Sequence, residues 1–139
     1  MPIADLGDLS LWYQCFESDA ADRVPALLIQ GLGMQATDWP QTLIDRLLAE
    51  RPVIVFDNRD VGLSQKIDEA GMPDYPAILT ALAAGQKPPV AYTLNEMAAD
   101  TVGLLDTLGI RRAHIVGASM GGMISQLVAA DYPDRVLSL

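Results

Sequence analysis

The chain has 139 residues, of which 50% are hydrophobic and 19% are charged. This length fits one domain or part of one, and the composition excludes a chain that is mainly disordered. Asp and Glu number 18 against 9 Lys and Arg, and the net charge of -9 would repel nucleic-acid phosphates and anionic lipid. We therefore expect no nucleic-acid partner.

The sequence indicates neither a secretory signal nor a membrane segment. Residues 1–8 carry acidic side chains and no Lys or Arg, whereas a secretory signal places positive charge before an apolar stretch. The apolar run from Val24 to Ile29 is far shorter than the ~20 residues that span a bilayer. A single cysteine, Cys15, excludes an internal disulfide and a cysteine-based zinc site. We therefore expect a cytoplasmic protein with no membrane partner.

Short apolar runs predict the strands of a sheet, and some are apolar without a break, as strands buried on both faces of a parallel sheet are. The predicted strands cover residues 9–16, 26–30, 52–57, 113–117 and 135–139. Amphipathic segments between them predict helices over residues 38–49, after a cap at Thr37 or Asp38, over residues 93–108, with a capping box of Thr93 and Glu96, and over residues 120–130. Strands that alternate with helices imply an α/β fold, with a mostly parallel sheet and helices on both faces.

Residues 65–92 are predicted to form a long connection beside the carboxyl edge of the sheet. Glycines and prolines punctuate this stretch, and only Tyr75, Ile78, Leu79 and Leu82 have the spacing of a short helix.

The sequence Gly117-Ala118-Ser119-Met120-Gly121 matches the G-x-S-x-G pattern and joins a predicted strand directly to a predicted helix. This is the setting of a nucleophile elbow, where the serine lies in a strained turn and crowding requires small residues at the Gly117 and Gly121 positions. The backbone N–H of Met120, at the start of the helix, would stabilise negative charge on a substrate oxygen. The alternative is that the glycines only allow close packing and that Ser119 is a helix cap.

A second N–H donor is expected from the loop Gln30-Gly31-Leu32-Gly33, because it follows the preceding strand and its glycines allow the backbone to approach a substrate. The loop lacks the third glycine of a dinucleotide-binding fingerprint and the lysine of a P-loop. Another loop, Asp57-Asn58-Arg59-Asp60-Val61-Gly62-Leu63-Ser64, also follows a strand. Asp57 and Arg59 are either substrate contacts or parts of a turn tied by polar side chains.

His114 is the sole histidine, but it is not expected to serve as the general base for Ser119. It precedes Ser119 on the same strand, and an extended chain of about 3.3 Å per residue separates the two by about 16 Å. We expect a neighbouring group to satisfy the hydrogen bonds of this histidine.

These motifs together resemble the α/β-hydrolase superfamily, which has them in the same order and with the same spacing along nearly the whole chain. The Asp57 to Asp60 turn and the loop without histidine are most similar to the serine esterases that include aclacinomycin methylesterase. The resemblance implies Ser119 as nucleophile, Leu32 and Met120 N–H groups as the oxyanion hole, a small-molecule ester substrate, and neither cofactor nor metal. Gln30 stands where many members have histidine, which puts the substrate class inferred from the wider family in question.

In this family the acid and the histidine of the triad follow the serine. We therefore expect residues 1–139 to be the amino-terminal part of a single α/β-hydrolase domain, truncated near the strand after the nucleophile helix. Such a fragment would be inactive alone, and would form homo-oligomers or require the missing carboxyl-terminal portion. The leading hypothesis is a serine hydrolase of carboxylic esters. The alternatives are a cofactor-free perhydrolase or acyltransferase of the same fold, and a non-catalytic fragment or interaction protein.

Overall fold

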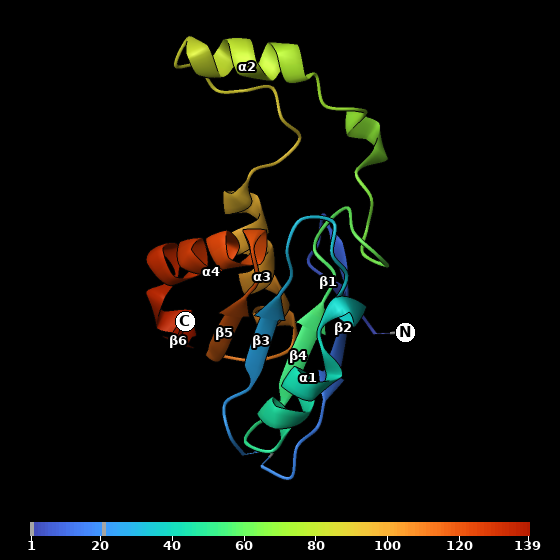
Figure 1. Ribbon diagram of the computed structural model, residues 1–139, viewed down its shortest axis with the longest axis vertical. Helices are drawn as coiled ribbons and strands as arrows, with labels where there is room; N and C mark the ends of the chain where they lie inside the picture. The colour runs from blue at the N-terminus through green and yellow to red at the C-terminus, as the bar shows by residue number, and fades with distance from the viewer. Residues whose placement is uncertain (1, 21) are drawn as a thin grey trace.

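A computed structural model describes residues 2–20 and 22–139. Within these residues the strands form one sheet in the order β1-β2-β4-β3-β5-β6 (Figure 1). The strand bounds are β1 Ile3–Asp5, β2 Ser10–Phe16, β3 Ala26–Ile29, β4 Val53–Phe56, β5 Ala113–Gly117 and β6 Val136–Ser138. Strand β3 pairs in parallel with β4 and β5, and β5 with β6, whereas β2 is antiparallel to β1 and β4. The prediction of a mostly parallel sheet is confirmed.

Helices cover both faces of this sheet. The α-helices are α1 Gln41–Leu48, α2 Tyr75–Ala83, α3 Leu94–Thr107 and α4 Met120–Asp131. Side chains alternate along the central strands, so that Leu27 and Ile29 pack with α3 and α4, while Ala26 and Leu28 pack with α1. Strands β3 and β4 are buried along their whole length and contain no polar residue. Their unbroken apolar runs are the reason that the sequence predicted both strands.

The predicted start of the first helix is wrong. A 3-10 turn covers Ala36–Asp38, and α1 begins only at Gln41. Trp39 has extended backbone angles, φ -68 and ψ 129, because the ring of Pro40 excludes the helical region for the residue before it. Asp38 instead accepts a hydrogen bond of 2.7 Å from the Gln35 N–H, within the 3-10 turn.

Strand β1 was not predicted from the sequence. It pairs with β2 through Ile3, Ala4 and Asp5, and of these side chains only Ala4 is buried. A strand this short with a single small buried residue does not produce the period-two pattern on which sequence prediction depends. Pairing with β2 stabilises this strand, and the local propensity of its residues does not reveal that pairing.

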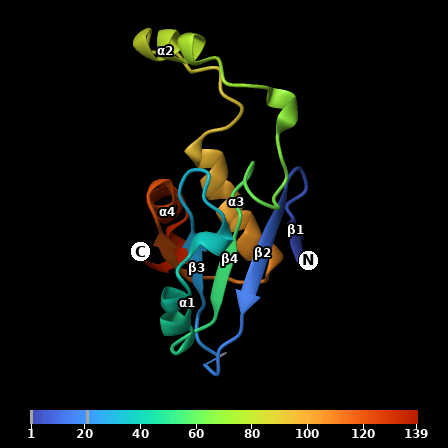
Figure 2. The same cartoon turned by 45° about the vertical axis from the view of Figure 1, so that its right-hand side comes forward.

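The excursion, residues 65–92, leaves the sheet after β4 and returns at the start of α3. It contains α2, which the spacing of apolar residues predicted, and a 3-10 turn, Asp68–Ala70, which was not predicted. Figures 1 and 2 both show α2 standing away from the sheet, beyond the end where the parallel strands finish. In the described residues, no helix has the length and apolar character needed to cross a membrane.

Candidate active site

Ser119 lies at the turn between β5 and α4, with φ 54 and ψ -121. A positive φ is strained for any residue other than glycine, and such strain is typical of functional turns. The residue occupies the N-cap position of α4, yet its side chain makes no capping hydrogen bond. The serine is exposed, so its hydroxyl faces solvent and is not engaged in holding the helix. This geometry disfavours the interpretation of Ser119 as a helix cap.

Crowding around the turn explains its glycines. A Cβ atom at Gly117 would lie 2.4 Å from the Gly121 carbonyl oxygen, and one at Gly121 would lie 2.0 Å from the carbonyl oxygen of Ile29. Both obstacles are backbone atoms, which cannot move aside as a flexible side chain can. At Gly122, by contrast, the nearest atom would be 3.6 Å away, an ordinary contact. Strand β3, the turn and α4 therefore approach one another as closely as backbones without side chains allow.

The loop from Gln30 to Ala36 runs directly past Ser119. A Cβ atom at Gly31 would lie 3.2 Å from the Cβ of Ser119 and 3.7 Å from its Oγ. The Ala118 N–H donates to the Ile29 carbonyl at 3.0 Å and fixes the serine turn to the start of this loop. Leu32, the expected donor, follows Gly31 and has a largely exposed side chain. Met120 is the first residue of α4, so its N–H has no acceptor within the helix.

The loop after β4 braces the Gln30 to Ala36 loop. The carboxylate of Asp57, 2% exposed, accepts hydrogen bonds from the N–H groups of Ala36 at 2.7 Å and Leu63 at 2.9 Å. The neighbouring Asn58 amide donates to the Gln30 carbonyl at 3.2 Å. These bonds favour the interpretation of Asp57 as part of a tied turn rather than as a substrate contact.

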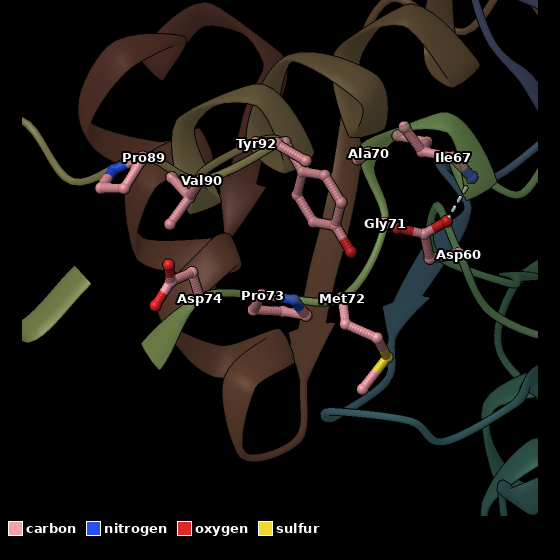
Figure 3. Close-up of a pocket in the computed structure, with 11 residues that line it drawn as sticks. Asp60, Ile67, Ala70, Gly71, Met72, Pro73, Asp74, Pro89, Val90 and Tyr92 are labelled. Carbon is pink, nitrogen blue, oxygen red and sulfur yellow. Dashed lines mark hydrogen bonds between the residues drawn. The ribbon is translucent and has the colours of Figure 1, made fainter. Parts of the chain in front are cut away.

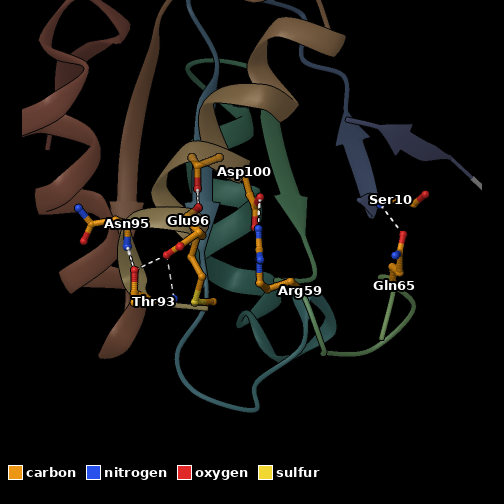
Figure 4. A network of polar contacts seen from close by, with 9 residues as sticks. Ser10, Arg59, Gln65, Thr93, Asn95, Glu96 and Asp100 are labelled. Carbon is orange, nitrogen blue, oxygen red and sulfur yellow. Dashed lines mark hydrogen bonds and ion pairs between the residues drawn. The ribbon is translucent and has the colours of Figure 1, made fainter. Parts of the chain in front are cut away.

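Arg59 joins the same turn to α3. Its guanidinium donates two hydrogen bonds of 2.6 Å to the carboxylate of Asp100 (Figure 4) and lies 5.0 Å from the ring centre of Tyr92. Hydrogen bonding to the Asp100 carboxylate, which accepts from the guanidinium, raises the pKa of Arg59, and burial is the main cause that raises the pKa of Tyr92 to about 12. Arg59 is therefore committed to a buried ion pair.

Sequence reasoning missed Asp100 as the partner of Arg59. The available signal was its place on α3, because Asp100 falls between Met97 and Leu104 on the buried face. A carboxylate at such a position needs a cationic partner.

His114 is engaged away from the serine. Its Nδ1 lies 2.8 Å from the hydroxyl oxygen of Ser138, on the neighbouring strand β6. Burial, and secondarily the charge of Arg51, lowers the pKa of this imidazole. The strand that carries His114 ends at Gly117, before the serine turn. The expected satisfaction of this histidine by a neighbour is thus observed.

Two pockets are relevant to the site, and one of them is lined by residues of the serine turn and of the Gln30 to Ala36 loop. The first, called here the Met97 pocket, has a volume of about 220 Å³ and is lined by Leu32, Arg59, Val61, Leu94, Met97 and Met120, among others. The second, of about 460 Å³, lies between two stretches of the excursion, one carrying Met72 and the other Val90 and Tyr92 (Figure 3). Only the first includes both residues expected to donate N–H groups.

A strained serine between a buried parallel strand and a helix, facing a glycine loop from the adjacent strand, defines the class of α/β hydrolases. The chain belongs to the alpha/beta hydrolase fold family, whose profile matches residues 25–139.

Two similar proteins are hydrolases by name. The chain is 35% identical over 133 residues to rhodomycin D methylesterase DnrP of Streptomyces peucetius, covering 95% of this chain and 38% of that protein. It is 35% identical over 119 residues to the putative carbamate hydrolase RutD of Variovorax paradoxus, covering 86% and 37%. The chain thus spans well under half the length of these relatives.

Solved structures show the same fold. The enol-lactonase from Burkholderia xenovorans LB400 superposes with a TM-score of 0.74 at 26% identity, over 97% of this chain and 44% of that one. A thermophilic esterase from Thermogutta terrifontis superposes with a TM-score of 0.67 at 27% identity, over 92% and 38%. The expected partial α/β-hydrolase fold and the likeness to methylesterases are both confirmed.

Proposed function

We propose that the chain is the amino-terminal part of a serine hydrolase that acts on carboxylic esters of small molecules, with Ser119 as its nucleophile. The conformation of Ser119 carries this proposal. Its positive φ is a strained conformation of the kind that functional turns hold, and its side chain makes no capping hydrogen bond to α4 although the residue is exposed. The names of the relatives, a methylesterase and a carbamate hydrolase, support hydrolysis of an acyl compound at this position.

The reaction consists of two acyl transfers. Ser119 Oγ attacks the carbonyl carbon and loses its proton to a general base, and the carbonyl oxygen becomes negatively charged. The N–H groups of Leu32 and Met120 bind this oxyanion. The intermediate then expels the alcohol, which receives the proton from the base. Water next attacks the acyl-serine ester, again through the base, and releases the acid and the free hydroxyl of Ser119.

The general base belongs to a part of the protein outside residues 1–139. His114 cannot act in this way, because its position on β5 and its contact with Ser138 hold it away from the hydroxyl of Ser119. A histidine from the remaining part of the domain, oriented by an acid, completes the site as the family order implies. Without that base the serine hydroxyl is a weak nucleophile.

The test is hydrolysis of p-nitrophenyl butyrate by the complete protein. Replacing Ser119→Ala should lower kcat by a factor of the order of 10⁴ to 10⁶ while leaving the circular dichroism spectrum and Tm unchanged. Ser138→Ala is the matched control, because it removes a serine hydroxyl that is also exposed, and it should retain turnover. A fluorophosphonate probe should label the wild type and not the Ser119 variant. Turnover by Ser119→Ala above a few per cent of wild type contradicts the assignment.

A further inference from the structure

The Met97 pocket opens beside the groups expected to bind the substrate carbonyl. Leu32 and Met120 form part of its wall, and their N–H groups are the proposed oxyanion donors. From this placement we infer that the pocket binds the acyl group of the ester, and that it selects an uncharged, apolar acyl group up to about the size of a six-membered ring. This inference rests on the proposed function and specifies its substrate class.

The charges around the pocket disfavour an ionised acyl group. Arg59 is the cation in the pocket wall, but both oxygens of Asp100 already accept hydrogen bonds from it at 2.6 Å. The pair is nearly buried, with side-chain exposures of 13% for Arg59 and 10% for Asp100. Because one group is a cation and the other an anion, the net charge of the pair is zero. Glu96 lies on the first turn of α3, next to Met97 of the pocket wall, and the chain as a whole has a charge of -9. A carboxylate in the acyl group would therefore be repelled without gaining a free cation.

Apart from Arg59, the wall consists of hydrocarbon and thioether side chains together with Gly33, the ring of Tyr92 and the small side chain of Thr93. Val61 comes from the turn after β4, Leu94 and Met97 from α3, and Met120 from the start of α4. An apolar cavity of about 150 Å³ holds a benzene molecule, so a pocket of about 220 Å³ has room for a short alkyl chain or one ring. Because methionine side chains are flexible and polarizable, the pocket can adapt to either shape.

The acyl group, rather than the alcohol, is the better occupant of the pocket. The alcohol leaves after the first step, whereas the acyl group stays bonded to Ser119 through both steps. A pocket whose wall includes the two oxyanion donors therefore contacts the acyl group in both transition states. Binding there raises kcat/KM for an apolar acyl group that fills the pocket and lowers it for a charged one.

The first test compares p-nitrophenyl butyrate with mono-p-nitrophenyl succinate, which shares its leaving group but carries a carboxylate on the acyl chain. In the complete protein, kcat/KM should favour the butyrate by about tenfold or more. Val61→Lys places a cation in the pocket and should lower that preference by about tenfold or more. Leu63→Lys is the matched control, because Leu63 is exposed on the same turn and does not line the pocket, and it should leave the ratio within about twofold.

A second test does not depend on turnover. In the Ser119→Ala protein, titration with p-nitrophenyl butyrate should shift the ε-methyl NMR signals of Met97 and Met120 and leave those of Met72 and Met123 in place. The succinate ester should shift none of them at the same concentration. Equal shifts with both esters, or equal hydrolysis of both, overturn the inferred selectivity. A wild-type protein that binds the butyrate at Met97 but does not hydrolyse it contradicts the proposed function and supports the pocket.

Discussion

The buried carboxylate of Asp57 accepts a hydrogen bond of 2.7 Å from the backbone N–H of Ala36. This bond joins the end of the loop that passes Ser119 to the turn that follows β4. The next residue, Asn58, holds the beginning of the same loop through the Gln30 carbonyl. Two adjacent side chains therefore fix both ends of the segment that contains Leu32, and the proposed oxyanion donor is positioned by the turn after β4.

Asp57→Ala should destabilise the protein. It removes the acceptor for the N–H groups of Ala36 and Leu63, and each unpaired N–H costs about 1–3 kcal/mol, so we expect a loss of about 2–6 kcal/mol in the free energy of unfolding. Urea denaturation of the complete protein measures this loss in the free energy of unfolding. Asp68→Ala, in the exposed 3-10 turn of the excursion, should change that free energy by less than about 0.5 kcal/mol. An equal effect of the two substitutions would contradict the bracing role of Asp57.

Gly121 and Gly122 offer a direct comparison of crowding at the serine turn. Gly121→Ala places a Cβ 2.0 Å from the Ile29 carbonyl oxygen, so the turn must shift, and both Tm and turnover should fall. Gly122→Ala meets its nearest atom at 3.6 Å and gains about 1 kcal/mol of helix propensity, so Tm should stay constant or rise. Thermal unfolding and p-nitrophenyl butyrate hydrolysis measure both effects. Equal Tm values for the two variants would exclude the close approach of β3 to α4.

The Arg59–Asp100 pair should show strong coupling in a double-mutant cycle. Each single alanine variant leaves one buried charge without its partner and should lose about 3–5 kcal/mol of stability, whereas the double variant should lose much less than the sum. Denaturant unfolding of the wild type and of all three variants gives the coupling free energy. Additive losses would mean that the pair contributes no specific interaction.

The features predicted most accurately from the sequence are those that depend on residues close together in the chain. The capping box of Thr93 and Glu96 starts α3 where predicted, because both partners lie within one turn of chain. The Gly117 to Gly121 pattern likewise lies at a strand-to-helix turn, since the crowding involves consecutive residues. The hydrogen bond from Ala36 to Asp57 and the ion pair from Arg59 to Asp100 were not predicted. Their partners are far apart in sequence, and only the sheet topology brings them together.

The last prediction concerns His114, whose pKa is lowered by burial. Because the unfolded chain binds the proton more tightly, this group contributes stability above its unfolded pKa of about 6.5, and the contribution is lost as the pH falls through the lower folded pKa. The difference in unfolding midpoint between wild type and His114→Gln should therefore change as the pH falls below about 6.5 and be constant well above it. The pH profile of kcat should be the same in both proteins, because the proposed mechanism does not use His114 as the base for Ser119. A loss of turnover in His114→Gln as large as that in Ser119→Ala would show that this imidazole does reach the nucleophile.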